Sequence, residues 1–423
     1  MFVYPDLSKE FPGYEYNKYG IDKSRYISPD VIISGKSIYK GYDPGEGGFV
    51  YAQPGMYGKS MCFDSASHHP SSLIAENGFG PYTENFKSLL DIRLHIKHKE
   101  YDVVKEMFGG VMAPYLGSKE DAKMLSNALK IAINSVYGLT AAHFDNKLRD
   151  PRNVDNWVAK RGALFMIDLM LEVQKRGYNV IHIKTDSIKI ENADMDIYQF
   201  VYDYGKKFGY TFEIEHIFDR LCLVNDAVYI CKYTDDPENE DKAGKWDATG
   251  AQFAEPYIFK TLFSDEPIVF EDLCQTYTTS VGLGLYLDMN EDLPDVTAEE
   301  KELSKLESKW KKRDDRSGKE WDDDSAHMEF LKNIISTGHA YHFVGKAGLF
   351  CPMKPGAGGG LLVRENNGKY AFPSGAKGYR WMEAEMVKSL GKENDIDISY
   401  YAMLTDKAIA AINEYGDFEQ FSH

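Results

Sequence analysis

The sequence has few cysteines, and none is spaced to bind zinc or to build a disulfide framework. Its five cysteines are scattered along 423 residues, and no two form a Cys-x-x-Cys pair. Structural zinc sites use closely spaced cysteine or histidine ligands, and disulfide-built scaffolds are short and rich in cysteine. Neither class is favoured, so we expect five buried thiols in a reducing compartment.

Long apolar stretches are also lacking. No run approaches the roughly 20 residues that a membrane-spanning helix needs. The first residues are not a basic region followed by an apolar stretch, as a secretory signal requires. We therefore expect a cytoplasmic protein without membrane contact. Aromatic residues are plentiful (29 Tyr, 23 Phe and 5 Trp), which excludes global disorder, and the length allows about two to three domains.

Positive charge is scarce. The chain has 49 Lys and Arg against 66 Asp and Glu, which gives a net charge of −17. A net charge of this sign argues against nucleic-acid binding, because phosphate contacts need Lys and Arg. The charges are uneven, however: acidic clusters lie at 235–241 and 291–324, whereas basic residues gather between Arg93 and Arg161. Since binding depends on the local field, the basic central third leaves DNA binding open.

Helical and strand patterns alternate along the first 250 residues. We expect strands at 60–64, 180–183, 187–190, 211–217 and 221–233 and helices at 84–108, 118–137, 152–176 and 194–208. This order predicts an α+β fold with one antiparallel sheet, and its first two helices predict a helical hairpin. Farther on, we expect a charged helix at 297–313, interpreted as a solvated face or linker, and a docked helix at 404–421.

Three polar motifs lie on these elements. Asp64 ends the first strand before a Ser-rich turn, where backbone N–H groups beside a carboxylate could hold a metal and a phosphate. Lys130, Asn134 and Tyr137 share one helix face, a strip suited to touching a phosphate, a base edge and a sugar. Asp186 lies at a hairpin tip. Taken singly, the three have plainer interpretations: a strand-capping Asp, a solvated stripe and a turn Asp.

The order and spacing of the three motifs resemble the polymerase core of family B DNA polymerases. Motif A of that family reads Asp-x-x-Ser-Leu-Tyr-Pro-Ser, motif B reads Lys-x-x-x-Asn-Ser-x-Tyr-Gly, and motif C reads Tyr-x-Asp-Thr-Asp-Ser. Here motif A corresponds to residues 64–71 and motif C to residues 182–187. Motif B matches at every specified position of residues 130–138.

Further segments extend the resemblance to roughly residues 40–250, beginning with Gly47-Gly-Phe-Val50 and Pro54-Gly55 upstream of motif A. Arg93 and Lys97 fit the Arg-x-x-x-Lys of the family's fingers helix, and Lys232-Tyr233 resembles its primer-gripping segment. The resemblance implies a right-hand polymerase with an antiparallel-sheet palm, helical-hairpin fingers and a C-terminal thumb. The implied parts are an N-terminal segment with the first part of the palm (1–81), the fingers (82–138), the palm (139–250) and the thumb with the C-terminal region (251–423).

The resemblance implies template-directed addition of dNTPs to a primer 3′-hydroxyl with two Mg²⁺ ions, for which Mn²⁺ could substitute. Asp64, Asp186 and the backbone of Ser65 would hold the metal ions, and Lys130 would protonate the pyrophosphate leaving group. The implied dNTP-binding residues are Ser67, His68, His69, Arg93, Lys97, Lys130, Asn134 and Tyr137. The implied primer–template contacts are Gly138, Thr185, Lys232 and Tyr233.

Several positions depart from the family pattern. Motif C has Lys184 in place of its first Asp and His182 in place of its Tyr, and Cys231 replaces a Lys near the primer-gripping Tyr. Lys184 supports one alternative, a non-catalytic DNA-binding replication subunit that kept the fold. His69 replaces the Tyr that packs under the incoming sugar. It supports a second alternative, a polymerase that accepts ribonucleotides or starts primers de novo.

Only 63 residues precede Asp64, and none form the Asp-x-Glu of a proofreading domain. We therefore expect no 3′→5′ exonuclease and a resemblance to polymerase-only chains of bacteriophages, acting in the host cytoplasm. The expected partners are primer–template DNA, dNTPs and separate replication proteins such as an exonuclease or a clamp. Tyr415, Phe418 and Phe421 near the end are interpreted as packing on the thumb, with docking to a clamp or partner subunit as the alternative.

Overall fold

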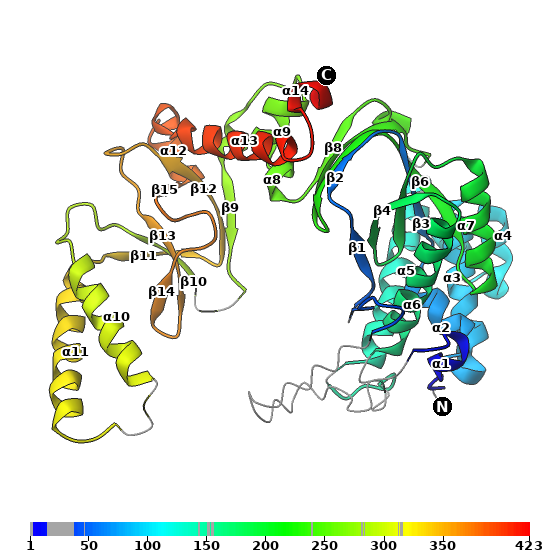
Figure 1. Ribbon diagram of the computed structural model, residues 1–423, viewed down its shortest axis with the longest axis horizontal. Coiled ribbons are helices and arrows are strands. Elements are labelled where there is room, and N and C mark those ends of the chain that lie inside the picture. Colours follow the sequence, from blue (N-terminus) through cyan, green and yellow to red (C-terminus); the bar gives the residue numbers. More distant parts are fainter. Residues whose placement is uncertain are drawn as a thin grey trace. The chain divides into compact units, whose positions relative to one another are not determined.

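The computed structural model describes residues 3–14, 38–45, 47–142, 144–149, 153, 156–237, 240–280, 282, 284–311, 313 and 316–423. Two units make up the chain: residues 1–253 together with 411–423, and residues 254–410 (Figure 1). No pattern in the sequence predicts that residues 411–423 belong to the first unit. The division into palm, fingers and thumb stays a prediction.

The first unit combines long helices with a single large sheet. Its strands are β1 Val50–Ala52, β2 Gly55–Tyr57, β3 Ser60–Ser65, β4 Asn179–Lys184, β5 Ser187–Glu191, β6 Phe212–Asn225, β7 Val228–Asp235 and β8 Trp246–Thr249. Its helices are α1 Leu7–Glu10, α2 His68–Ala75, α3 Thr83–Lys97, α4 Tyr101–Glu106, α5 Lys119–Thr140, α6 Trp157–Lys175, α7 Met195–Lys207 and α14 Phe418–Ser422, and α8 Ala251–Ala254 ends it. Short 3₁₀ turns are η1 Gly80–Tyr82, η2 Met107–Gly110, η3 Ala113–Leu116 and η4 Glu240–Lys242.

The sheet of the first unit has eight antiparallel strands. Their order is β1-β4-β5-β3-β6-β7-β8, and β2 pairs with β6. The predicted α+β fold with an antiparallel sheet is confirmed. Because β5 pairs with β3, the hairpin near residue 186 lies beside the strand that ends near residue 64. The fold therefore joins two of the three motifs.

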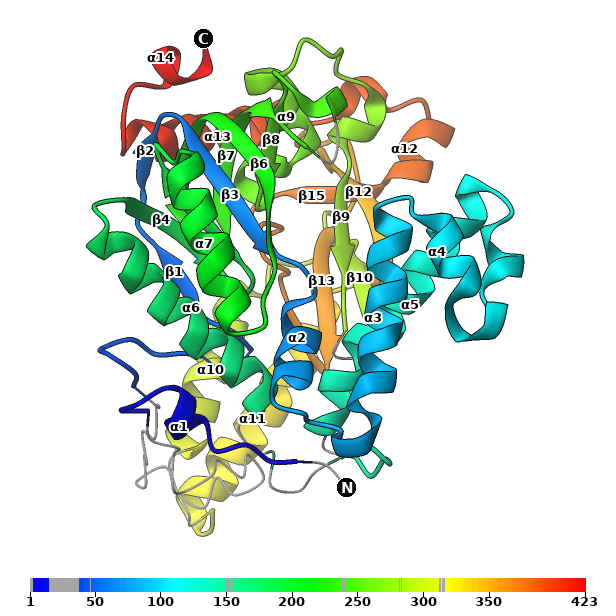
Figure 2. The ribbon, with the colours of Figure 1, turned by 90° about the vertical axis from the view of Figure 1, so that its right-hand side faces the viewer.

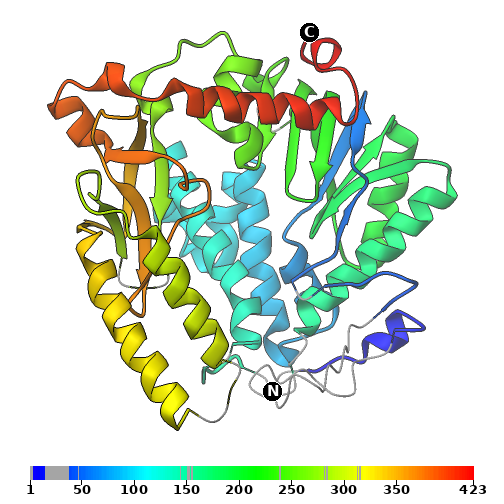
Figure 3. The same ribbon diagram turned by 60° about the vertical axis from the view of Figure 1, so that its left-hand side comes forward.

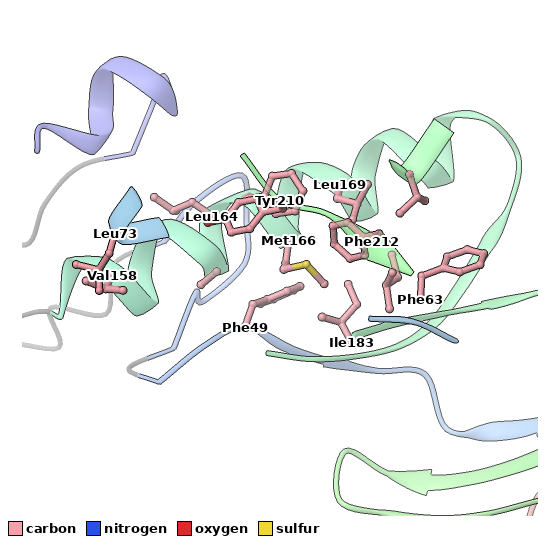
Figure 4. Close-up of a cluster of buried hydrophobic side chains, with 14 of the residues drawn as sticks. Phe49, Phe63, Leu73, Val158, Leu164, Met166, Leu169, Ile183, Tyr210 and Phe212 are labelled. Atoms are coloured by element: carbon pink, nitrogen blue, oxygen red, sulfur yellow. The ribbon is translucent and has the colours of Figure 1, made fainter. Parts of the chain in front are cut away.

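One face of this sheet packs on the main core, and the other carries both a smaller hydrophobic cluster that includes Cys62 and the polar residues of the site. Ile188 and Ile190 of β5 and Phe63 of β3 lie in the main core, together with most side chains of α6. Figure 2 shows α6 and α7 along the sheet, and Figure 4 shows how Phe63 and other core side chains gather there. Successive strand residues point to opposite faces, so Ser187 and Lys189 lie on the other face.

The predicted helix at 84–108 is broken into α3 and α4. Lys99 takes a left-handed conformation (φ 62°). The N–H of Glu100 bonds to the His95 carbonyl, and that of Lys99 bonds to the Ile96 carbonyl. These two bonds form a Schellman motif, which ends α3 without a glycine. Helix α5 starts as predicted, since the Ser118 hydroxyl accepts the Asp121 N–H at 3.0 Å, and α3 and α5 lie side by side (Figure 3).

One predicted strand break is also wrong. The strands expected at 211–217 and 221–233 are instead β6 and β7, whose turn falls at residues 226–227. The pairing of β6 with β7 shifts register near Phe218. A bulge absorbs an extra residue without ending a strand, so the polar residues that follow Phe218 lie within β6 and do not mark a turn.

A buried arginine joins distant parts of the first unit. Arg161 of α6 is 2% exposed at its side chain. Its guanidinium bonds to the carboxylates of Glu10 and Glu76, to the Tyr210 hydroxyl and to the Phe208 carbonyl. One side chain therefore connects α1, α2, α6 and the start of β6.

The second unit carries two smaller antiparallel sheets, ordered β11-β10-β13-β14 and β15-β12-β9. Its strands are β9 Gln275–Thr278, β10 Gly284–Asp288, β11 Tyr341–Gly345, β12 Ala347–Met353, β13 Leu361–Asn366, β14 Lys369–Ala371 and β15 Arg380–Glu383. Its helices are α9 Pro256–Phe263, α10 Thr297–Lys311, α11 Lys319–Thr337, α12 Ala384–Ser389 and α13 Ile398–Asn413, and its 3₁₀ turns are η5 Phe270–Leu273 and η6 Glu393–Asp395. Among the described residues, no helix combines the length and apolar character needed to cross a bilayer.

Two predictions for the later part of the chain need correction. The charged helix α10 is mostly exposed, as expected of a solvated face, but it is not a linker, because its Trp310 is buried, stacks edge-on to Trp321 of α11 and donates to Asp324 at 2.7 Å. The expected terminal helix is two helices, α13 and α14. Phe421 of α14 packs on Trp246 of β8, so the aromatic tail lies on the first unit and not on the part assigned to a thumb.

Candidate functional site

Asp64 and Asp186 lie on neighbouring strands. Asp64 of β3 pairs in register with Ser187 of β5, and the Ser65 N–H donates to the Asp186 carbonyl at 2.9 Å. Both aspartates are half-buried. The antiparallel pairing therefore brings together two carboxylates that are far apart in the sequence.

The hairpin that carries Asp186 is supported from β1. Its tip residue, Thr185, has a left-handed backbone (φ 60°) and donates its N–H to the Phe49 carbonyl at 2.9 Å. A Cβ on Gly48, whose own φ is 146°, would come within 2.8 Å of the Thr185 side chain. A glycine is therefore required where the chain leads into β1. Thr185, predicted to contact the primer–template, lies next to Asp186.

Negative charge accumulates around the two aspartates. Glu213 of β6 pairs in register with Asp64. Burial and the nearby Glu215 raise the pKa of Asp186, against the opposing effects of Lys189 and Lys130. A divalent cation would relieve this excess of negative charge.

The donors fit Mg²⁺ rather than a softer metal. Mg²⁺ prefers oxygen ligands, keeps several waters and is commonly bound by one or two carboxylates plus substrate phosphates. Asp64 and Asp186 supply such a pair. Over the described ranges, no group of three or more His, Cys, Asp or Glu side chains is arranged to hold a metal ion by itself.

The backbone after Asp64 differs from the expectation. The N–H groups of Ser65 and Ala66 bond to the carbonyls of Asp186 and Thr211, so neither can donate to a phosphate. Helix α2 begins just beyond them. The first N–H groups of a helix have no carbonyl partner within it and favour anions; in α2 these come from His68 and His69, because Pro70 has no N–H.

Helix α3 brings two of the predicted cations to the sheet. Arg93 donates to the Ser67 hydroxyl at 3.1 Å, which connects α3 to the motif A turn. Lys97, one turn later, forms an ion pair with Glu213 at 2.8 Å. The residues expected to meet a triphosphate therefore lie beside the aspartate pair.

The two motif A histidines have different environments. His69 lies against Tyr137 of α5, with ring centroids 4.2 Å apart, and burial lowers the pKa of His69 to about 4. His68 is buried in the core, stacked on Tyr210 and packed against Gly162 of α6. The prediction that the His68 side chain binds a dNTP is therefore not supported by its position, whereas His69 and Tyr137 meet.

The motif B strip on α5 is largely exposed. Lys130, Asn134 and Gly138 are exposed and Tyr137 is half-buried. The charge of Lys130 is among the weaker influences on the pKa of Asp186, which it lowers.

The predicted primer-gripping residues are part of the sheet. Tyr233 of β7 is 4% exposed and donates its hydroxyl to Asp247 at 2.6 Å. Lys232 is half-buried, with its ammonium 5.6 Å from the centre of the Trp246 ring. As placed, Tyr233 supports the strand, and Lys232 is the more accessible of the two.

The site has further polar residues that the motifs did not include. Glu213 and Glu215 alternate on β6, and Lys189 of β5 is 5% exposed, with its ammonium 3.3 Å from Nδ1 of His182. Alternating glutamates on the strand expected at 211–217 were a usable signal for a polar sheet face. Nothing local predicted that this face would meet Asp64.

Comparison with known proteins gives a distant likeness in fold to solved structures. No protein-family model and no curated protein matches the chain. A solved structure of the family B DNA polymerase from the hyperthermophilic archaeon Pyrobaculum calidifontis matches with a TM-score of 0.42 and 12% sequence identity. The match covers 86% of this chain and 46% of that one, so this chain spans less than half the length of that polymerase. A likeness at this level assigns no residue.

Proposed function

We propose that the chain is a template-directed DNA polymerase that extends a primer 3′-hydroxyl with dNTPs. The observation that carries this proposal is the pairing of Asp64 with the hairpin of Asp186, which places two half-buried carboxylates on neighbouring strands. The complete motif B strip, whose Lys130 acts electrostatically on Asp186, supports it further. In this proposal the sheet of the first unit is the palm, α3 and α5 belong to the fingers, and the second unit contains the thumb.

The residues have distinct tasks in this reaction. Asp64, Asp186 and the Ser65 carbonyl would hold two Mg²⁺ ions, which stabilise charge on the attacking and leaving oxygens. Arg93 and Lys97 neutralise the triphosphate, and the start of α2 offers it N–H donors. Lys130 gives a proton to the departing pyrophosphate. This proton transfer would remove charge from the leaving group, and stabilisation of developing charge is usually a large contribution to the rate.

Lys184 does not favour a non-catalytic subunit. It is exposed at the end of β4, in register with Ser187. The charges with the strongest influence on Asp186 come from Glu215, Lys189 and Lys130. A surface lysine in this position leaves the aspartate pair accessible.

Primer extension tests the proposal. With a primed DNA template and Mg²⁺, the protein should extend the primer by the nucleotide complementary to the next template base. A change of that base should change the nucleotide that is added, and EDTA should abolish extension. DNA binding without extension, under both Mg²⁺ and Mn²⁺, would instead identify a non-catalytic subunit. Lys184→Asp would then be the first reversion to examine.

The contact between His69 and Tyr137 predicts an effect on sugar selection. His69→Tyr places a larger ring beside Tyr137 and should raise the preference for dNTPs over rNTPs about tenfold, the scale of a small steric change in a pocket. The measurement is kcat/KM for matched dNTP and rNTP in single-nucleotide extension. His342→Tyr, an exposed position in the second unit, is the matched control. An unchanged ratio in the His69 variant would remove this side chain from sugar recognition.

A further inference from the structure

One triphosphate-binding candidate already has an anionic partner. Lys97 of α3 donates to the Glu213 carboxylate at 2.8 Å, and His98 lies 3.5 Å from the other oxygen. Burial alone would raise the pKa of Glu213, but Lys97 and His98 lower it below its usual value. Glu213 is therefore a carboxylate held by two residues at the end of α3.

The position of Glu213 connects this ion pair to the aspartates. Glu213 and Asp64 are directly opposed on β6 and β3, so their side chains lie on the same sheet face. The contact thus holds the end of α3 against the strand that carries Asp64. An anion bound to a metal ion that Asp64 also holds would therefore lie close to Lys97.

We propose that Glu213 is a displaceable counter-ion, which holds Lys97 beside the aspartate pair until the triphosphate of the incoming nucleotide replaces it. This inference rests on the proposed function and names a regulating residue of the same site. Glu213 acts through Lys97 and is a positioning residue, not a catalytic one.

The exposure of the pair suits exchange. Both side chains are 34% exposed, and ion pairs this accessible to water are weak. A triphosphate carries several negative charges and can replace a single carboxylate at Lys97.

Removal of the counter-ion should tighten nucleotide binding. In Glu213→Gln, binding of a non-hydrolysable α,β-imido dATP to the protein–primer–template complex, measured by calorimetry, should be about three- to fivefold tighter, the scale of a half-exposed ion pair. The KM for dATP should fall by the same factor, with kcat within about twofold. Glu213→Asp, which keeps the charge but withdraws the carboxylate, should shift both constants in the same direction by less.

Two comparisons isolate the route through Lys97. Asp219→Asn removes a negative charge from the same strand, where it pairs with Arg220, and should leave analogue binding unchanged. In a Lys97→Met background, the effect of Glu213→Gln should disappear. Unchanged or weaker binding in Glu213→Gln, or tightening that persists without Lys97, would overturn the inference. Loss of all extension in the wild type would instead refute the proposed function.

Discussion

Replacement of Asp186 by Asn is expected to lower the rate of primer extension about 10³-fold, with DNA binding retained. Asn keeps the shape of the side chain and leaves the backbone bond from Ser65 intact, so the hairpin should persist. The charge that would bind Mg²⁺ is lost, and metal ions supply several kcal/mol of transition-state stabilisation. Single-turnover extension at saturating dNTP measures the effect on the chemical step.

Asp64→Asn should give a similar loss, and the double variant should lose little more, because residues that hold one metal site act as a unit. Binding of Mn²⁺ to the free protein, followed by electron paramagnetic resonance, should weaken in both single variants. Asp203→Asn, an exposed change on α7, is the control and should extend primers normally. Extension by the Asp186 variant within tenfold of the wild type would show that Asp186 is not a metal ligand.

Local signals were sufficient to predict the elements that carry the site. The Ser118 cap, the apolar run of β3 that ends in Asp64 and the turn at residues 184–186 are all determined by neighbours in the sequence. Two positions within this frame could not be predicted. His68 and His69 are adjacent, yet one is in the core because Gly162 and Tyr210, from distant segments, make room for its ring.

Long-range strand pairing set the remaining features. The ion pair of Lys97 with Glu213 depends on the register of β3 with β6, which no local pattern specifies. The same holds for Phe421, whose partner Trp246 comes from β8. Sequence motifs therefore indicate which residues carry the chemistry, while the sheet register determines which of them meet.

Arg161→Met is expected to destabilise the first unit by about 3–5 kcal/mol, the usual cost of removing one partner from a buried ionic network. The arginine side chain is 2% exposed and bonds to Glu10 and Glu76. Met fills a similar volume but cannot replace these bonds, so both carboxylates would remain near each other without their cation. The free energy of unfolding of this unit is measured by urea denaturation, with unfolding monitored through hydrogen exchange of peptides from α6.

The pH dependence of that loss distinguishes a charge effect from a packing effect. Burial already raises the pKa of Glu10 in the wild type, and removal of Arg161 would raise it further. A carboxyl group whose pKa is higher in the folded state than in the unfolded state favours folding as the pH falls, so the deficit should shrink between pH 7 and pH 5. Lys175→Met, which removes an exposed ion pair from the same helix, should be neutral at both pH values. A deficit that is constant with pH would mean that packing around the guanidinium, and not the two carboxylates, holds α1 and α2 to α6.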